Sequence, residues 1–410
     1  MSRFNYVSLF SGIGGFEQAL NSFGGECVFA SEIDKFATQA YEALYGHRPA
    51  GDVTQVNAKD VPDHDLLVGG FPCQAFSLAG KRKGFEDTRG TLFFEIVRIA
   101  KEKQPKALLL ENVKGLVNHD KGNTLEVMLK TLNDIGYVVD FDILNSKYFG
   151  VPQNRERIFI VAIREDLIEQ EEWLEESTIG QTVIPRGKRR IQTYEWLKSF
   201  NFNFPTQENV SKRLVDILEQ SVDERFYLGE DKTAKLTSEL EDRERQEVLG
   251  ALPMECEIHG EGIIQIGEAN IKGHRAIRAV HSPEGQCPTL TTMGGGHREP
   301  KIAVVGNIND NDHNAENARS KDGLPPTITA RDYKEPKLVA GDSAGGSCYR
   351  IRKLTPLECW RLQGFPDEAH DTVERAGLSN SQRYKQAGNA VTVSVIKAIA
   401  ANLLPSVINK

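Results

Sequence analysis

The residues with the clearest chemical potential stand at the ends of predicted strands. Cys73 directly follows one predicted strand, and Glu111 closes the next strand along the chain. Arg155 and Arg157 lie just before a later strand. A thiol in a turn that faces a cleft can be activated as a nucleophile, whereas a buried structural cysteine is inert. Because the carboxyl ends of parallel strands meet at one edge of a sheet, we expect this thiol and this carboxylate to meet there.

A second group of residues could bind a ligand. The first predicted strand ends at Phe10 and continues into the glycine-rich segment 11–16, where the backbone could approach a ligand closely. Glu32 ends the next strand and could accept hydrogen bonds from a ribose, and Asp52 could bond an adenine amino group. The glycine spacing is not the Gly-x-Gly-x-x-Gly of a dinucleotide site. A tight turn without a ligand, and a simple turn role for Asp52, therefore stay open as alternatives.

Alternating strands and helices must position these residues. Strands are predicted at 6–10, 27–31, 66–69, 107–110, 137–144 and 158–163, with helices at 16–23, 35–45 and 92–103 between several of them. Strands separated by helices indicate βαβ units. We therefore expect an α/β fold with a doubly wound, mostly parallel sheet.

The pattern changes after residue 165. The segment 165–176 holds seven acidic residues, and the segment 181–213 then carries seven Lys or Arg against two acids. Such a charge run is usually a solvated face, and a role in DNA binding is the alternative. From about residue 240 the chain is rich in Gly, Pro, Thr and His, and the stretch from Ser282 recurs in variant form from Ser320. This pattern predicts a smaller, irregular second domain, in which the repeat is a duplicated strand–loop–strand.

The helical pattern returns near the C-terminus. Thr355 is a predicted N-cap ahead of Pro356, and an apolar helix is expected over 392–404. We expect this segment to pack back on the first domain. The predicted division is therefore a first segment at 1–180, an inserted domain at 181–350 and a returning segment at 351–410.

Composition limits the class of protein. The 410 residues are 39% hydrophobic and 26% charged, which excludes a disordered or low-complexity chain. The six cysteines include no Cys-x-x-Cys pair, so neither a disulfide scaffold nor a metal site is expected. No bilayer-spanning apolar run or signal peptide is evident, so we expect a soluble, cytoplasmic protein. The net charge of -8 at first argues against nucleic acid as a partner, but net charge averages over faces.

Five motifs together resemble one family. The segments Phe-Ser-Gly-Ile-Gly-Gly-Phe at 10–16, Pro-Cys-Gln-Ala-Phe-Ser at 72–77, Glu-Asn-Val at 111–113, Gln-Asn-Arg-Glu-Arg at 153–157 and Gln-Ala-Gly-Asn-Ala-Val at 386–391 occur in the order of the DNA cytosine-5 methyltransferases. The chain is similar to prokaryotic or phage members of that family. The resemblance implies a methyltransferase fold that binds S-adenosyl-L-methionine, with a target-recognition domain inserted at 181–350.

The resemblance implies a covalent mechanism. C5 of cytosine is a weak nucleophile, so Cys73 would first add to C6, and covalent catalysis divides a hard step into easier ones. Glu111 would stabilise a proton at N3, and Arg155 and Arg157 would approach O2 and the nearby backbone. The alternative for both arginines is a simple ion pair with an acidic residue.

The resemblance also implies the residues that bind the cofactor and the DNA. The expected cofactor residues are Phe10, Gly12, Gly14, Glu32, Ile33, Asp52, Pro72, Leu92, Asn389 and Val391. Ile33 stands where family members often have a tryptophan that stacks on adenine. The expected DNA contacts are Gln74, Ser77, Arg82 and Arg89 in an active-site loop, and Lys272, Arg275, Thr289, His297 and Arg298 in recognition loops.

The implied partner is double-stranded DNA, from which the target base is flipped. A cognate restriction endonuclease is a further candidate partner, and a monomer is expected. Two alternatives stay open. One is a tRNA cytosine-5 methyltransferase of similar fold, and the other is a DNA-binding module with an inactive site.

Overall fold

The computed structural model describes residues 3–72, 92–229, 231–238, 257–259, 262–293, 298–306 and 348–408. Its large sheet has six strands in the order β2 (Gly25–Ser31), β1 (Phe4–Leu9), β3 (Leu66–Gly70), β4 (Ala107–Val113), β6 (Glu156–Arg164) and β5 (Tyr137–Asn145). Each of these strands was predicted from the sequence to within a few residues at either end. The expected α/β fold is confirmed.

Strand direction in the large sheet is mixed. Strand β1 pairs in parallel with β2 and β3, and β3 pairs in parallel with β4, as expected. Strand β6 is antiparallel to both β4 and β5. The reason is the short connection 146–155 between β5 and β6, which holds only a turn of 3₁₀ helix. Parallel neighbours need a long crossover, so strands joined this closely run antiparallel.

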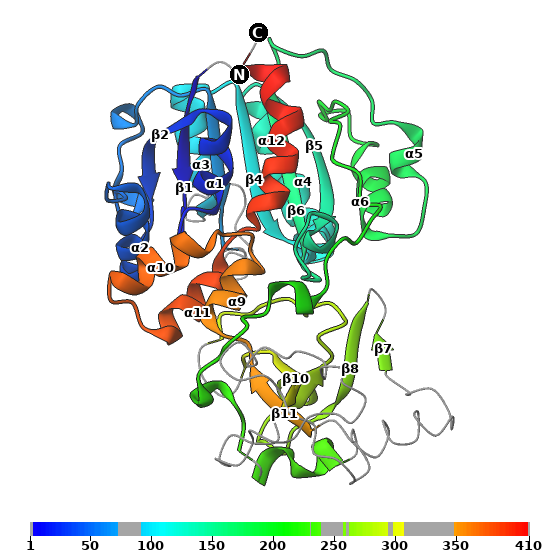
Figure 1. The fold of residues 1–410 in the computed structure, drawn as a ribbon. Coiled ribbons are helices and arrows are strands. Elements are labelled where there is room, and N and C mark those ends of the chain that lie inside the picture. Colours follow the sequence, from blue (N-terminus) through cyan, green and yellow to red (C-terminus); the bar gives the residue numbers. More distant parts are fainter. Residues whose placement is uncertain are drawn as a thin grey trace.

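Helices cover both faces of the large sheet and lie around its edges. They are α1 (Gly15–Leu20), α2 (Lys35–Tyr45), α3 (Leu92–Lys103), α4 (Asn123–Asp134), α5 (Glu175–Thr178), α6 (Val183–Ile191), α9 (Pro356–Arg361), α10 (Asp367–Arg375), α11 (Asn380–Asn389) and α12 (Val393–Val407). In Figure 1, α1 and α12 lie on one face, and α3 and α4 on the other. Within β4, Leu109 packs toward α1 and α12, whereas Leu108 and Leu110 pack toward α3 and α4. This two-sided burial explains why residues 107–110 of β4 form a continuous apolar run.

The C-terminal segment returns to the large sheet, as expected. Helix α12 packs against α1 (Figure 1). Thr355 caps α9, and Glu358 completes a capping box with it. The stretch Asn380–Ile408 is long and apolar enough to cross a membrane, contrary to expectation. It is weak evidence of insertion, because α12 buries its apolar residues against α1 in this fold.

A smaller sheet lies apart from the first (Figure 1). Its described strands follow the order β11 (Cys348–Lys353), β10 (Lys301–Gly306), β9 (Ala279–His281), β8 (Ile263–Glu268) and β7 (Glu257–His259), and the short helix α8 (Arg275–Arg278) precedes β9. A small core that includes Ile266, Val280 and Ile351 supports it. The second copy of the internal repeat lies outside the described residues. The domain boundaries at 180 and 350 stay a prediction.

The basic run 181–213 is largely neutralised by the fold. Lys188 forms a buried ion pair with Asp140, and Arg190 pairs with Glu126. Lys198 and Arg213 likewise pair with acidic residues. Helix α6, which carries much of this charge, packs beside the large sheet away from the smaller one (Figure 1). These contacts argue against the run as a DNA-binding surface.

A buried ion pair joins the smaller sheet to helix α9. The Arg352 guanidinium donates to both carboxylate oxygens of Glu358 at 2.7 and 2.8 Å, and both side chains are 0% exposed. Arg352 lies on β11 of the smaller sheet, and Glu358 lies on α9. Glu358 also accepts the backbone N–H groups of Thr355 and Glu219. One carboxylate therefore fixes the point where the chain leaves the smaller sheet.

Replacing Arg352 with methionine should destabilise the protein by about 3–5 kcal/mol, because Glu358 would stay buried without its cation. Urea unfolding followed by circular dichroism measures this change. The matched control is Arg350→Met on the same strand, whose partner Glu224 is 55% exposed. That change should cost about 1 kcal/mol or less. Equal losses in the two variants would contradict the importance of the buried pair.

Candidate active site at the carboxyl edge of the large sheet

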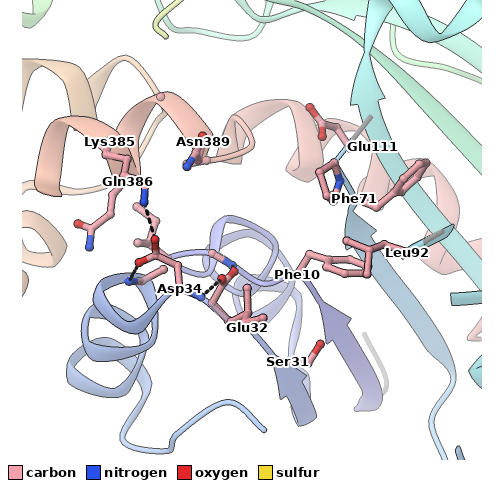
Figure 2. Close-up of a pocket in the computed structure, with 18 of the residues that line it drawn as sticks. Phe10, Ser31, Glu32, Asp34, Phe71, Leu92, Glu111, Lys385, Gln386 and Asn389 are labelled. Carbon is pink, nitrogen blue, oxygen red and sulfur yellow. Dashed lines mark hydrogen bonds and ion pairs between the residues drawn. The ribbon is translucent and has the colours of Figure 1, made fainter. Parts of the chain in front are cut away.

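A pocket of about 420 Å³ opens at the carboxyl ends of β1 to β4. The strand order reverses between β1 and β3, because β2 lies on one side and β4 on the other. Open α/β sheets bind ligands at such a switch point. Figure 2 shows the pocket between Phe10, Glu32 and Leu92 on one side and Asn389 of the C-terminal segment on the other. Both halves of the chain therefore build it.

Most of the expected cofactor residues line this pocket. They are Phe10, Gly12, Glu32, Ile33, Asp52, Pro72, Leu92 and Asn389. Ile33 is 76% exposed, so its side chain is available to a ligand at the pocket mouth. Gly14 and Val391 are not among the lining residues. Gly14 faces Tyr45, and Val391 packs beside Gly15 and Gly70, so both lie behind the pocket wall.

Glu32 organises the glycine-rich turn. One carboxylate oxygen accepts the backbone N–H of Gly12 at 2.8 Å, and the other accepts that of Asp34 at 2.7 Å. A carboxylate has about four acceptor positions, so Glu32 can still accept hydrogen bonds from ligand hydroxyls. Phe10 adopts a left-handed φ of 56°, a conformation that is rare outside glycine and concentrated at functional sites.

Asp52 combines the two roles considered for it. Its Oδ1 accepts the backbone N–H of Thr54 at 2.9 Å and the Thr54 hydroxyl at 2.8 Å, which caps a short 3₁₀ helix. It also lines the pocket. The residue is thus a turn residue whose carboxylate stands at the ligand site.

Glu111 is a buried acid with a cationic neighbour. Its side chain is 11% exposed, and its Oε1 lies 3.1 Å from Nε of Arg157. In the antiparallel register Arg157 stands opposite Val113, two residues from Glu111 and therefore on the same face of the sheet. Burial raises the pKa of Glu111, and the charges of Arg157 and Arg155 oppose that rise without cancelling it. The carboxyl therefore holds a proton more readily than an exposed glutamate.

Arg155 is buried and binds backbone oxygens. It is 3% exposed, and its guanidinium donates to the backbone oxygens of Ala390 at 2.9 Å, Gly388 at 3.2 Å and Leu290 at 3.4 Å. Arg155 also lines the pocket, as Arg157 does, and the approach of both arginines to the base stays a prediction. The alternative of a simple ion pair fits Arg157, which pairs with Glu111, and does not describe these contacts of Arg155.

Sequence reasoning missed several residues of the pocket wall. Lys385 forms an ion pair with Asp34 at 2.5 Å (Figure 2), and Gln386 donates to the backbone oxygen of Phe36 at 3.0 Å. Both contacts span about 350 positions of sequence. Gln386 is the first residue of the motif at 386–391, which is the signal that could have indicated it. Asn112 donates to the backbone oxygen of Phe71 and ties the end of β4 to the turn that leads to Cys73.

The other expected residues are either outside the described residues or in the smaller domain. Cys73, Gln74, Ser77, Arg82, Arg89 and His297 fall outside the described residues. Lys272 and Arg298 are exposed. Arg275 pairs with Glu268 at 3.1 Å, and the Thr289 hydroxyl donates to the backbone oxygen of Asn154 at 2.6 Å. Thr289 thus joins the expected recognition region to the segment that carries Arg155.

One group with the geometry of metal ligands occurs within the described ranges. It consists of His370, Asp371 and Glu374. The Arg383 guanidinium bonds Nε2 of His370 at 2.8 Å and Glu374 at 2.6 Å. A cation already occupies this position, so the group does not indicate a metal site.

Comparison with known proteins identifies the family. The family model described as C-5 cytosine-specific DNA methylase matches residues 4–404. The chain is 43% identical to a putative type II methyltransferase, M.BsuMIIP, of Bacillus subtilis (strain 168), and 43% identical to an orphan methyltransferase, M.SPBetaI, of Bacillus phage SPbeta. Each of these matches covers 100% of this chain and 99% of the relative. The type II methyltransferase M.HhaI of Haemophilus parahaemolyticus is 35% identical, over 98% of this chain and 95% of that protein.

A solved structure supports the fold. The Dnmt2 methyltransferase of S. pombe matches with a TM-score of 0.56 at 19% identity, over 98% of this chain and 99% of that chain. The pocket at the switch point and the buried Glu111 agree with what the sequence matches indicate. The chain therefore belongs to the C-5 cytosine-specific DNA methylase family and is a DNA cytosine-5 methyltransferase that depends on S-adenosyl-L-methionine.

Proposed function

We propose that this enzyme methylates cytosine within a specific site of double-stranded DNA, with Cys73 as nucleophile and Glu111 as the acid that activates the base. The observation that carries the proposal is the buried Glu111–Arg157 pair at the pocket. In the β3–β4 register Glu111 stands opposite Gly70. Gly70 precedes Cys73 by three residues in the sequence. Both Glu111 and Pro72, which precedes Cys73, line the pocket. A flipped cytosine held there would meet the carboxyl of Glu111 and the thiol of Cys73 together.

The proposed chemistry begins at C6 of cytosine. The Cys73 thiolate forms a bond to C6 while the proton on Glu111 is shared with N3, so the electron pair of the C5–C6 double bond becomes available at C5. When bound, S-adenosyl-L-methionine supplies the methyl group that C5 accepts. A base then removes the C5 proton, the C5–C6 double bond re-forms and the Cys73 thiolate leaves. Arg157 fixes the Glu111 carboxyl and stays charged throughout.

The pocket residues suit this cofactor chemically. Glu32 keeps acceptor positions for ribose hydroxyls, and Asp52 offers a carboxylate to an amino group. Phe10, Ile33 and Leu92 supply apolar surface for a planar base. The lining therefore combines two carboxylates with apolar side chains, which matches an adenosine moiety.

Arg155 has a positioning role in this proposal. Its donors bridge Leu290, near the expected recognition loops, to the Gly388–Ala390 segment beside the pocket residue Asn389. It therefore holds the C-terminal wall of the pocket against the strand that carries Arg157. Gly388 permits this arrangement, because an added Cβ there would lie 2.0 Å from the backbone oxygen of Thr291.

The biological setting is also a proposal. The inserted region 181–350 would choose the DNA site, and the enzyme would act as a monomer in the cytoplasm. Four of the similar phage proteins are named orphan methyltransferases, which offers no support for a cognate endonuclease. Protection of phage DNA is therefore the role we favour.

Replacing Cys73 with alanine should lower methyl transfer by at least about 10³-fold, because the covalent step would be lost. Transfer of tritiated methyl groups to duplex DNA, with tRNA as the competing substrate, measures this and tests the polymer preference. The control is Cys27→Ala, because Cys27 does not line the pocket. Retained activity in the Cys73 variant would overturn the mechanism, and preferential labelling of tRNA would overturn the choice of DNA.

Replacing Glu111 with glutamine should lower methyl transfer by about 10²- to 10⁴-fold, because the acid would be lost. The same change should also alter the pH dependence of stability. Burial raises the pKa of Glu111, so the folded enzyme binds this proton more tightly than the unfolded chain does. The wild type should therefore lose stability relative to the variant as pH rises from about 4. Urea unfolding across pH tests this, and a constant difference between the two proteins would contradict it.

A further inference from the structure

The rear side of the glycine-rich turn contacts a tyrosine that the mechanism does not use. Tyr45 is the last residue of α2, and its hydroxyl donates to the backbone oxygen of Gly14 at 2.7 Å. The same hydroxyl lies 3.4 Å from the backbone oxygen of Ile13. Gln18 on α1 donates its side-chain amide to the Tyr45 hydroxyl at 3.2 Å. Tyr45 therefore joins α2, the turn and the start of α1 through one oxygen atom.

The Tyr45 ring also explains the identity of Gly14. The φ angle of Gly14 is 80°, and a Cβ at this position would lie 2.2 Å from Cε2 of Tyr45 and 2.4 Å from its hydroxyl oxygen. No side chain fits between the turn and the ring. Gly14 was expected to contact the cofactor, but it is absent from the pocket lining. Position 14 therefore requires a glycine because the Tyr45 ring lies directly behind the turn.

The turn is thus held from two sides. On the pocket side, Glu32 accepts the backbone N–H of Gly12. On the rear side, Tyr45 binds the Gly14 oxygen, and the Gly14 N–H donates to the backbone oxygen of Ser11 at 2.9 Å. Phe10, Gly12 and Ile13 line the pocket between these contacts, whereas Tyr45 does not. A change at Tyr45 therefore reaches the pocket only through the backbone of the turn.

Tyr45 itself is fixed by packing. Its ring centroid lies 4.6 Å from that of Tyr41. Tyr41 is 0% exposed and donates its hydroxyl to Oε1 of the buried Glu17 at 3.1 Å. The Tyr45 ring cannot follow the turn if the turn moves, so its hydroxyl is a fixed point for the backbone.

We propose that Tyr45 is a positioning residue for the cofactor: its hydroxyl fixes the Ile13–Gly14 backbone so that the turn is ordered before the cofactor binds. This inference rests on the proposed assignment of the pocket to S-adenosyl-L-methionine. Preorganisation lowers the cost of ordering at binding, so its loss weakens affinity. The methyl transfer itself does not involve Tyr45.

The test is Tyr45→Phe, which removes only the hydroxyl. One neutral hydrogen bond corresponds to a change of about 2- to 12-fold in affinity. Calorimetric titration with S-adenosyl-L-homocysteine should show a rise in Kd of this size. The KM for S-adenosyl-L-methionine should rise in parallel, while kcat at saturating cofactor stays within about twofold of the wild type.

Two further variants make the result decisive. Tyr41→Phe is the matched control on the same helix, and it should lower the melting temperature while leaving Kd within about twofold. Glu32→Gln tests the pocket assignment and should raise Kd. An unchanged Kd in Tyr45→Phe, or an equal rise in Tyr41→Phe, would overturn the role of Tyr45 alone. An unchanged Kd in Glu32→Gln would overturn the pocket assignment, and the inference with it.

Discussion

The site depends on one buried carboxyl being held next to one cation. An unpaired ionised carboxyl inside a protein is costly, and a carboxyl paired too strongly would give up its proton. Glu111 lies between these limits, because burial raises its pKa and the Arg157 charge restrains that rise. The antiparallel register of β4 and β6 sets this balance by placing Arg157 two positions along the same face. A parallel β6 would have required a different register and another source for the cation.

The pocket beside this pair depends on the return of the chain. Its N-terminal wall comes from the ends of β1 and β2, and its C-terminal wall comes from α11 and the residues after it. The two walls meet through polar contacts such as Lys385–Asp34. Behind them the contact is close and apolar, since Val391 packs where a Cβ on Gly15 would stand. The site therefore forms only when residues about 350 positions apart are brought together by α12 packing on α1.

Individual charged side chains, and not the net charge, make the contacts that hold the fold and the site. The chain carries a net charge of -8, and four of the seven basic residues in its most basic run form ion pairs within the fold. Three arginines outside this run each make a different kind of contact. Arg157 binds a carboxyl, Arg155 binds backbone oxygens, and Arg352 joins the smaller sheet to α9. Neither the net charge nor the local runs indicate which arginine has which role.

The sequence by itself determined the strands, the main helices and the order of the motifs, because apolar periodicity and capping residues such as Thr355 are local signals. It also predicted that Cys73 and Glu111 follow neighbouring strands at one sheet edge, and the structure places Glu111 at that edge. Only the tertiary structure decided three things. It placed β6 between β4 and β5, it directed Arg155 to three backbone oxygens, and it placed Tyr45 against Gly14. Each of these depends on contacts between segments distant in sequence, whose partners no local pattern specifies.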